Sequence, residues 1–254
     1  MGGSGVQFVF IVGASGSGTT MLLRILGALP GAIALGGNHI RLPNEDPRAP
    51  ALVRAFSQAN QVTWDRHAPF EIQNEARLRM RHVLEELLSL PGYESVSDVI
   101  FKRSAPFFVG DRHRPDLSDL FDVFPKSKVV AIYRDPRAST VSSLRRKFAE
   151  HLRQCAVITE EQLTYLSSQL STLPSSSYQI LRYENVCSRT DLRMERLALF
   201  LRKPATELMA AAQAEKVQPG RIDSWKEELD SADISFLDRF FDARRCQQWP
   251  LLLQ

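Results

Sequence analysis

The stretch GASGSGTT, residues 13–20, decides the fold of this chain. The apolar run 6–12 before it, interrupted only by Gln7, is typical of a buried β-strand, and the periodic stretch 21–29 after it is typical of a helix. Glycines let backbone N–H groups converge on an anion, and the N-terminus of a helix adds the positive end of its dipole. The order of strand, glycine-rich turn and helix therefore predicts a phosphate-binding loop.

The spacing of Gly13 and Gly18 also fits the loop that binds nucleoside triphosphates, in which a lysine follows the second glycine. Thr19 occupies that position here. A phosphate loop without this lysine indicates a ligand other than ATP with magnesium.

Strand-like and helix-like runs alternate along the rest of the chain. Further strands are expected at 32–35, 98–102, 128–133 and 178–181. Further helices are expected at 75–90, 137–153, 160–173, 193–201, 205–216 and 234–243. Strands separated by helices predict an α/β fold: a P-loop-containing three-layer structure with a central parallel sheet flanked by helices. Residues 38–70, rich in Pro, Asn, Asp and His, predict an irregular, substrate-facing insertion.

Length and composition favour one intracellular domain. The 254 residues are compatible with a single α/β domain, with 1–5 as a flexible lead-in. A net charge of +3 is too small to indicate nucleic-acid binding. No basic segment precedes the first apolar run, and no apolar stretch reaches the roughly 20 residues that cross a bilayer, so we expect a soluble, cytoplasmic protein.

Two local sets of residues have an ordinary interpretation. The basic residues at 77, 79 and 81 and at 145–147 have helical spacing, which predicts solvated helix faces. The three cysteines at 155, 187 and 246 are far apart and lack metal-ligand spacing, which predicts free thiols.

A second motif lies at the expected strand 128–133 and the helix after it. Arg134 follows the strand, and Ser142 lies about two turns into the helix, with Pro136 near its first turn. The carboxyl ends of parallel strands share one edge of the sheet, so Arg134 is expected on the same edge as the glycine loop. A guanidinium and a hydroxyl there can hold a phosphate by forked and single hydrogen bonds.

Together these motifs resemble the sulfotransferase superfamily, whose enzymes use 3′-phosphoadenosine-5′-phosphosulfate as sulfuryl donor. Residues 17–20 match the Ser-Gly-Thr-Thr of its first motif, and Arg134 with Ser142 matches the second. Looser matches occur at 124–129, at 181–185 and at 220–226. The resemblance spans most of the chain and is greatest to the bacterial and tyrosylprotein-type branch.

This resemblance implies a ligand and a set of site residues. The donor and its product, adenosine 3′,5′-bisphosphate, would bind without a metal. The loop would hold the 5′-phosphosulfate, while Arg134 and Ser142 would hold the 3′-phosphate. The implied donor-binding residues are Gly16, Ser17, Gly18, Thr19, Thr20, Arg134, Ser142, Tyr183 and, as a lid contact, Arg221. Trp225 is expected either to stack near the adenine or to pack in the core.

Gly16 is the one serious departure from the family pattern, which places arginine or lysine there to bind the 5′-phosphate and bridging oxygen. A cation beside a developing anion stabilises the transition state by roughly several kcal/mol. Either another cation substitutes, with Lys102 and Arg103 at a strand end as candidates, or the protein is impaired or only binds the nucleotide.

An acceptor hydroxyl or amine also needs a general base. The resemblance directs attention to the segment after the first helix, where His39 is the first candidate, with Glu45, Asp46 and His67 as alternatives. The aromatic residues at 64, 70, 107 and 108 are expected to line an acceptor pocket or to belong to the core.

Three functions therefore stay open. The first is sulfuryl transfer to a small-molecule, glycan or peptide acceptor. The second is a P-loop small-molecule kinase, which the missing loop lysine and the lack of an evident paired aspartate for magnesium disfavour. The third is a non-catalytic nucleotide-binding protein of the same fold.

Overall fold

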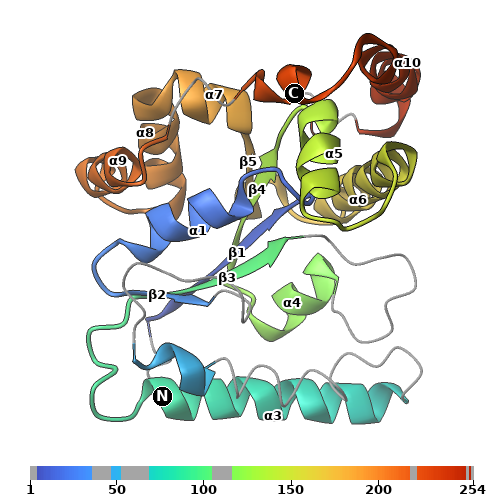
Figure 1. Cartoon of the computed structure of the whole chain (residues 1–254). Helices are drawn as coiled ribbons and strands as arrows, with labels where there is room; N and C mark the ends of the chain where they lie inside the picture. The colour runs from blue at the N-terminus through green and yellow to red at the C-terminus, as the bar shows by residue number, and fades with distance from the viewer. Residues whose placement is uncertain are drawn as a thin grey trace.

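The protein is built around one five-stranded parallel sheet (Figure 1). A computed structural model describes residues 5–35, 47–52, 69–104, 116–217, 222–249 and 252. The strand order is β2-β3-β1-β4-β5, and each neighbouring pair is parallel. The strands are β1 (Gln7–Gly13), β2 (Ala32–Leu35), β3 (Asp98–Ser104), β4 (Lys128–Tyr133) and β5 (Tyr178–Arg182).

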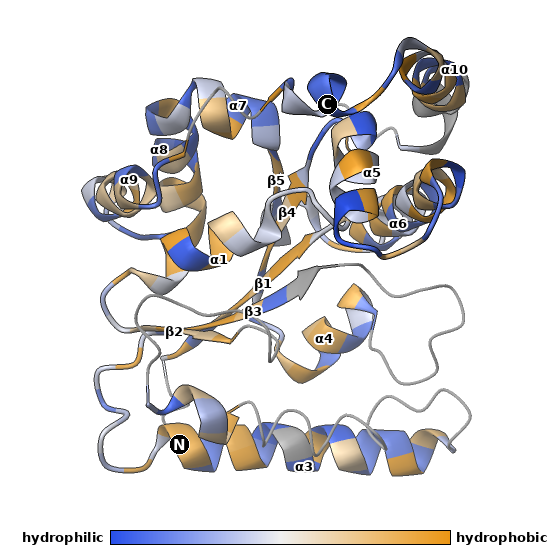
Figure 2. Ribbon diagram, in the orientation of Figure 1, coloured by the Kyte–Doolittle hydropathy of each residue, from blue (hydrophilic) through white to orange (hydrophobic). Residues whose placement is uncertain are grey.

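Alternate side chains of β1 enter two separate apolar cores. Phe10 and Val12 belong to one cluster of buried residues, whereas Val9 and Ile11 belong to the other. All four are at most 1% exposed. A parallel strand covered on both faces is expected to be apolar throughout, and Figure 2 shows this hydrophobic character along β1.

Helices cover both faces of the sheet, which confirms the expected three-layer α/β fold (Figure 1). One core is closed by α3, α4, α5, α6 and α10, and the other by α1, α7, α8 and α9. The helices are α1 (Thr19–Gly27), α3 (Phe70–Leu88), α4 (Leu117–Val123), α5 (Pro136–Arg145), α6 (Leu152–Ser171), α7 (Tyr183–Ser188), α8 (Thr190–Leu201), α9 (Ala205–Ala214) and α10 (Ser231–Gln248), with short 3₁₀ turns η1 (Ser175–Ser177) and η3 (Ser224–Glu228).

The order of the strands places the functional motifs side by side. The chain moves from β1 through β2 to β3 on one side of the sheet, and then continues with β4 and β5 on the other side. In the pairing of β1 with β4, Val12 lies opposite Ala131, so the glycine loop and Arg134 leave the same carboxyl edge next to each other. Ligands of open α/β sheets bind at such a switch point.

All five expected strands are confirmed, and most expected helices begin earlier than predicted. The helix expected at 75–90 begins at Phe70, and the one expected at 160–173 begins at Leu152. The short helices α4 and α7 were not expected. Helix α4 begins with a capping box between Asp116 and Asp119. The helix is too short for its apolar periodicity to predict it.

The single helix expected at 137–153 is wrong, because α5 ends at Arg145. Lys147 adopts a left-handed backbone with φ of 57° and donates its N–H to the carbonyl of Leu144. The N–H of Phe148 reaches back to the carbonyl of Ser143. These two bonds form a Schellman motif, which normally has glycine at the left-handed position and therefore escapes prediction when lysine occupies it.

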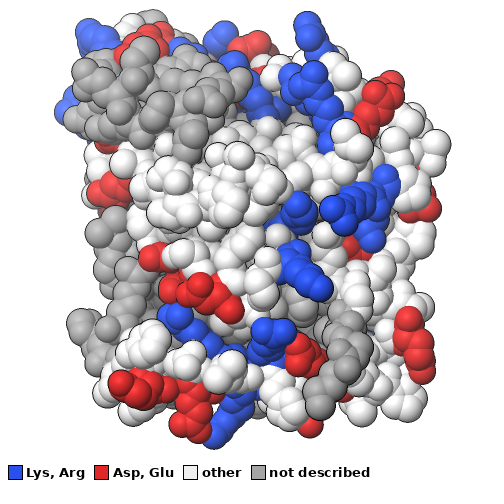
Figure 3. Space-filling model, turned by 180° about the vertical axis from the view of Figure 1, so that it is seen from behind, with Lys and Arg blue, Asp and Glu red and all other residues white. Residues whose placement is uncertain are grey.

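The interpretation of the basic residues as solvated faces holds only in part. Arg79 and Arg81 are exposed and pair with Glu75 and Glu85 along α3. Arg77, in contrast, is 16% exposed and forms ion pairs with acidic residues of α4. On the face turned away from the view of Figure 1, acidic and basic side chains are interspersed (Figure 3).

In the part of the chain that the structure describes, no helix combines the length and the apolar character that crossing a membrane requires.

Candidate functional site

Two glycines with positive φ shape the loop between β1 and α1. Gly16 has φ of 81° and Gly18 has φ of 103°, a backbone region that residues with a Cβ rarely adopt. Between them, Ser17 donates its N–H to the carbonyl of Ala14 at 3.1 Å, and its side chain is fully buried. Ser17 therefore stabilises the turn from inside.

The N-terminus of α1 is free of any side-chain cap. Gly18 is the N-cap residue, and the first backbone bond of the helix runs from the N–H of Leu22 to the carbonyl of Gly18 at 3.1 Å. The N–H groups of residues 19–21 accordingly have no partner within the helix. An uncapped helix N-terminus preceded by glycines favours an anion.

Side chains from three other elements hold the loop in place. Gln162 of α6 accepts a hydrogen bond from the N–H of Ser15 at 2.8 Å, and Arg134 donates to the carbonyl of Gly16 at 3.2 Å. Lys102, at the end of β3, donates to Oγ1 of Thr20 at 2.9 Å. The loop is thus tied to both of its neighbouring strands and to a helix of the far layer.

Gly18 is also in close contact with Tyr183, the first residue of α7. A Cβ at position 18 would lie 2.7 Å from the ring of Tyr183, and the guanidinium of Arg134 lies 4.4 Å from the centre of that ring. Arg134 therefore contacts both the loop and the tyrosine, and these two contacts orient its guanidinium.

Gly16 packs directly against Ser142 of α5. A Cβ at position 16 would lie 2.7 Å from Cβ and 2.8 Å from Oγ of Ser142, and 3.1 Å from the carbonyl of Ser139. Such distances leave no room for a side chain. The glycine that departs from the resemblance is consequently required by the way α5 meets the loop.

The pKa of Lys102 is lowered by its surroundings. Burial is the main cause that lowers the pKa of Lys102 to about 8, and the charges of Arg146 and Arg24 lower it further. The charges of these three cations therefore act on one another. Like charges that lower the pKa of one another are unfavourable, and an anionic ligand bound near them would reduce this cost.

A cavity of about 900 Å³ opens over the loop. Its walls come from α1, α5, α7, the end of α9 and η3. The residues that line it are Gly16, Gly18, Thr19, Thr20, Met21, Arg24, Arg134, Ala138, Ser142, Arg145, Arg146, Tyr183, Glu215, Lys216, Val217, Ser224, Trp225 and Glu228. A cavity of this size accepts a nucleotide-sized molecule.

Both carboxylates on the cavity wall are already neutralised. Glu215 pairs with Arg24 at 3.1 Å, and Glu228 pairs with Arg145. Arg146 is different, since it forms no ion pair with any residue that the structure describes. The cavity therefore presents an excess of positive charge, which suits a ligand with more than one anionic group.

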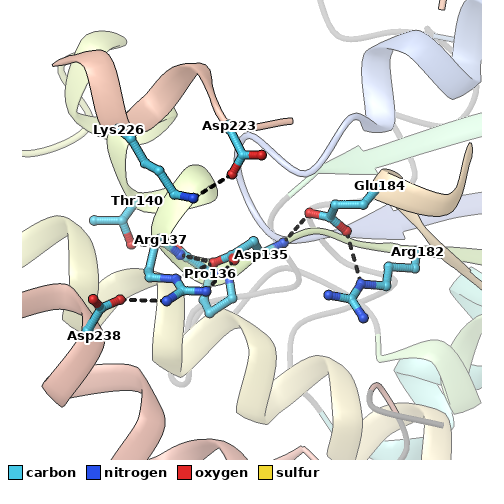
Figure 4. A network of polar contacts seen from close by, with 9 residues as sticks. All are labelled: Asp135, Pro136, Arg137, Thr140, Arg182, Glu184, Asp223, Lys226 and Asp238. Atoms are coloured by element: carbon cyan, nitrogen blue, oxygen red, sulfur yellow. Dashed lines mark hydrogen bonds and ion pairs between the residues drawn. The ribbon is translucent and has the colours of Figure 1, made fainter. Parts of the chain in front are cut away.

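A polar network anchors the start of α5 beneath this cavity (Figure 4). Asp135 caps the helix by accepting from the N–H of Arg137, and its own N–H donates to Glu184 at 2.8 Å. Arg137 also bonds Asp238 of α10 at 2.5 Å and lies 5.5 Å from the ring centre of Trp225. These contacts raise the pKa of Arg137, chiefly through its hydrogen bonds to Asp135, so this guanidinium has a structural role.

The structure brings together most residues that the sequence indicated. The loop residues, Arg134, Ser142 and Tyr183 meet at one cavity, and Lys102 contacts the loop from the side. Trp225 is buried and lines the cavity, so its expected packing role is confirmed, and stacking near the adenine stays a prediction. Phe70 is 71% exposed, so its interpretation as a core residue is wrong.

Several predicted residues lie outside the part of the chain that the structure describes. They are His39, Glu45, Asp46, Trp64, His67, Phe107, Phe108 and Arg221, together with the side chain of Arg103.

Sequence reasoning missed four side chains at the site. Gln162 belongs to no motif, and a glutamine inside a helix gives no indication in the sequence that it contacts a loop 147 positions away. Arg24, Arg145 and Arg146 line the cavity, although the last two were expected on a solvated face. Their position depends on how α1 and α5 pack, which periodicity does not report.

Comparisons with known proteins agree on one family. A model of the sulfotransferase family matches residues 8–207. No curated protein matches the chain significantly.

Similar structures have the same fold at low sequence identity. The sulfotransferase domain of the Synechococcus PCC 7002 olefin synthase superposes with a TM-score of 0.62 at 16% identity, over 93% of this chain and 94% of that one. The sulfotransferase domain from the curacin biosynthetic pathway gives 0.57 at 14% identity, over 93% and 98%. Retinol dehydratase, solved with androsterone and inactive cofactor PAP, gives 0.52 at 14% identity, over 93% and 80%. Because the family model covers most of the chain, the protein belongs to the sulfotransferase family.

Proposed function

We propose that the protein transfers a sulfuryl group from 3′-phosphoadenosine-5′-phosphosulfate to a hydroxyl or amine acceptor. The observation that carries this proposal is the cationic cavity at the uncapped start of α1, which Arg134 and Ser142 also line. Retinol dehydratase, which has the same fold, was crystallised with PAP, the desulfated form of this donor.

The described residues fit such a donor in two places. The N–H groups of the first turn of α1 and the hydroxyls of Thr19 and Thr20 would hold the 5′-phosphosulfate. Arg134 and Ser142 would hold the 3′-phosphate by charge-assisted hydrogen bonds. An adenosine bisphosphate has anionic groups at both positions, whereas the phosphates of ATP form one chain.

Thr19 supports a sulfuryl donor over ATP. In nucleoside triphosphate loops a lysine at this position reaches the β- and γ-phosphates. Sulfuryl transfer has no γ-phosphate to hold, and its demands are alignment of the acceptor and stabilisation of charge on the leaving phosphate. The donor supplies the activated sulfuryl group, and the chain's own residues position it and neutralise the charge.

Lys102 is our candidate for the cation that the loop lacks at position 16. It bonds Thr20 in the loop, and its ammonium lies in a partly buried setting where a charge acts strongly. The ammonium of Lys102 would donate a hydrogen bond to an oxygen of the donor beside Thr20. The general base for the acceptor stays a prediction, with His39 as the first candidate and Arg103 as a further cation.

Ligand-dependent thermal unfolding distinguishes this proposal from the kinase alternative. We expect adenosine 3′,5′-bisphosphate to raise the unfolding temperature without added metal, because binding to the folded state alone stabilises it. ATP with magnesium should raise it much less. Stabilisation by ATP with magnesium and none by the bisphosphate would contradict the proposed donor.

Transfer of label from ³⁵S-labelled donor distinguishes catalysis from binding alone. We expect wild-type protein to label at least one member of a panel of phenols, alcohols, sugars and amines, and Lys102→Met to lower the rate by a factor of about 100, as expected for loss of one donor to a developing anion. Binding of the bisphosphate without any transfer across the panel would favour the non-catalytic alternative. Restoring a cation by Gly16→Arg is not a useful test, since position 16 has no space for a side chain.

Arg134→Ala tests the second anion position. Its affinity for the bisphosphate, measured by calorimetry, should fall by roughly 1.5–3 kcal/mol, the contribution of a hydrogen bond to a charged group. Arg182→Ala is the matched control, because Arg182 ends the neighbouring strand and does not line the cavity. Unchanged affinity in Arg134→Ala would remove this residue from the site.

A further inference from the structure

The loop itself cannot carry a cation at position 16. Gly16 has a left-handed backbone, and any Cβ there would collide with Ser142. The collision is with a helix that is fixed at its start by Asp135 and Arg137, so α5 is not free to move away. A positive charge for the anion at the start of α1 must therefore come from another element.

The element that fills the space beside Gly16 also carries a cation one turn farther on. Ser142 contacts the position of the missing side chain, and Arg146 follows it by four residues. Side chains four residues apart lie on the same face of a helix. Arg146 is the C-cap residue of α5, and the bonds from Lys147 and Phe148 back into the helix hold this end in a defined conformation.

Arg146 lines the same cavity as Gly16, Thr19 and Thr20. Its neighbour Arg145 also lines it but is paired with Glu228. Arg146 has no carboxylate partner among the residues in the described ranges. An unpaired arginine on the wall of a cavity is available to a ligand, and its five N–H donors suit phosphate oxygens.

A second observation links the charge of Arg146 to Lys102. Arg146 is one of the two cations whose charges lower the pKa of Lys102. Lys102 in turn donates to Thr20, the second residue of α1. The other cation, Arg24, is paired with Glu215, which leaves Arg146 as the guanidinium with its charge uncompensated in this part of the described structure.

We propose that Arg146 binds the 5′-anionic group of the nucleotide and thereby takes over, from helix α5, the position of the cation that the loop lacks at Gly16. The positive charge is then supplied by the helix that packs against the loop, and not by the loop itself. Arg146 and Lys102 would then contact the same anion, one from α5 and one from β3. This inference rests on the proposed donor, because it assigns a residue to one end of that molecule.

The test compares two nucleotides that differ only at the 5′ position. Adenosine 3′,5′-bisphosphate has the 5′-phosphate, and adenosine 3′-monophosphate lacks it. We expect Arg146→Gln to weaken binding of the bisphosphate about tenfold or more in calorimetry, equivalent to about 1.4 kcal/mol. Binding of the 3′-monophosphate should change less than about twofold, a difference well below that of a charge-assisted hydrogen bond. Arg146→Lys should recover part of the loss.

Lys147→Gln is the matched control. It removes the same charge one residue away, at a position that is exposed and does not line the cavity. We expect it to leave both affinities nearly unchanged. Thermal unfolding of the ligand-free variants checks folding, which the exposed position of Arg146 leaves intact.

The outcomes separate this inference from the proposed function. An equal loss for both nucleotides, or the same loss in Lys147→Gln, would overturn the assignment of Arg146 to the 5′ group. So would an unchanged affinity in Arg146→Gln, while the proposed donor would stand on the binding of the bisphosphate to wild-type protein. A wild-type protein that binds neither nucleotide would overturn both.

Discussion

Gly16 shows how a single residue can be read in two ways. In sequence it is a missing cation, because the family pattern has arginine or lysine there. In the folded chain it is a packing position, with φ of 81° and a contact to Ser142 that excludes even a methyl group. The second reading explains why the residue is a glycine and directs the search for a cation to other elements.

Gly16→Ala should be markedly destabilising. The substitution combines an unfavourable backbone conformation, which costs about 1–3 kcal/mol, with overpacking, which costs a similar amount. The matched control is Gly92→Ala, since Gly92 has φ of 93° but open space around its position. Urea unfolding should show the larger loss for Gly16→Ala. Equal losses in the two variants would mean that α5 yields to the extra methyl group.

Lys102 should make nucleotide binding depend on pH. Its pKa of about 8, lowered by burial and by the charges of Arg146 and Arg24, means that it loses its charge as the pH rises from 7 to 9. The affinity for adenosine 3′,5′-bisphosphate should therefore fall across this range in wild-type protein and change less in Lys102→Gln. Parallel pH profiles of the two proteins in calorimetry would contradict this assignment.

The same shift affects stability of the ligand-free protein with the opposite sign. Because the folded pKa of about 8 lies below the ordinary lysine pKa of 10.5, the unfolded chain binds more protons between these values. The free energy of unfolding of wild-type protein should rise with pH in this window relative to Lys102→Gln. The lysine is thus unfavourable for folding at neutral pH, and bound anion offsets this.

At the scale of elements, the end of α5 is the least predictable feature and one of the most consequential. Nothing between Arg145 and Leu152 is glycine or proline, so the sequence reads as a continuing helix. The left-handed Lys147 ends it instead and allows α6 to begin in a new direction. Had the helix continued, Arg146 would not be held at a helix end beside the loop.

Arg137 joins three elements and should be important for stability. It bonds Asp135 at the start of α5 and Asp238 on α10, and it packs on Trp225 of η3. Arg137→Gln should lower the free energy of unfolding by about 2 kcal/mol, as loss of charge-assisted hydrogen bonds in a partly buried setting would.

Arg153→Gln is the control for this prediction. Arg153 lies 5.2 Å from the ring centre of Phe236, so it also contacts α10, through a cation–π interaction and no ion pair with the described side chains. Such a contact at an exposed site contributes about 0.5–1 kcal/mol. A loss in Arg137→Gln no greater than in Arg153→Gln, in chemical denaturation, would show that the network of Figure 4 contributes little to stability.

At the scale of the whole molecule, the site lies at the carboxyl edge of the sheet, at its switch point. The loop after β1, Arg134 after β4 and Tyr183 after β5 all leave from carboxyl ends of parallel strands (Figure 1). Helix α3 lies far from this edge, packed against α4 on the opposite side of the molecule. Ligand binding should therefore affect the two regions unequally.

Hydrogen exchange measures this inequality. Adenosine 3′,5′-bisphosphate should slow exchange of amides in residues 19–21, because their N–H groups gain a partner, and in residues 138–146 and 224–228, which include residues that line the cavity. Exchange in α3, residues 70–88, should stay the same. Protection confined to α3 would place the nucleotide elsewhere.

The sequence by itself determined the fold class, the five strands and the two anion-binding motifs. It could do so because buried parallel strands require uninterrupted apolar runs, and because a phosphate loop needs glycines between a strand and a helix. These are local requirements that appear as local patterns. The threonine at position 19, where nucleoside triphosphate loops have lysine, is likewise visible in the local sequence.

Only the tertiary structure decided which side chains meet at the site. That Gln162 pins Ser15, that Ser142 occupies the space of a side chain at Gly16, and that Arg146 faces the cavity all follow from the packing of helices against the sheet. Such contacts join residues far apart in the chain, and each is set by the distance and angle between elements. No local pattern encodes those quantities, so the missing cation is visible in the sequence, whereas its replacement becomes visible only in the folded protein.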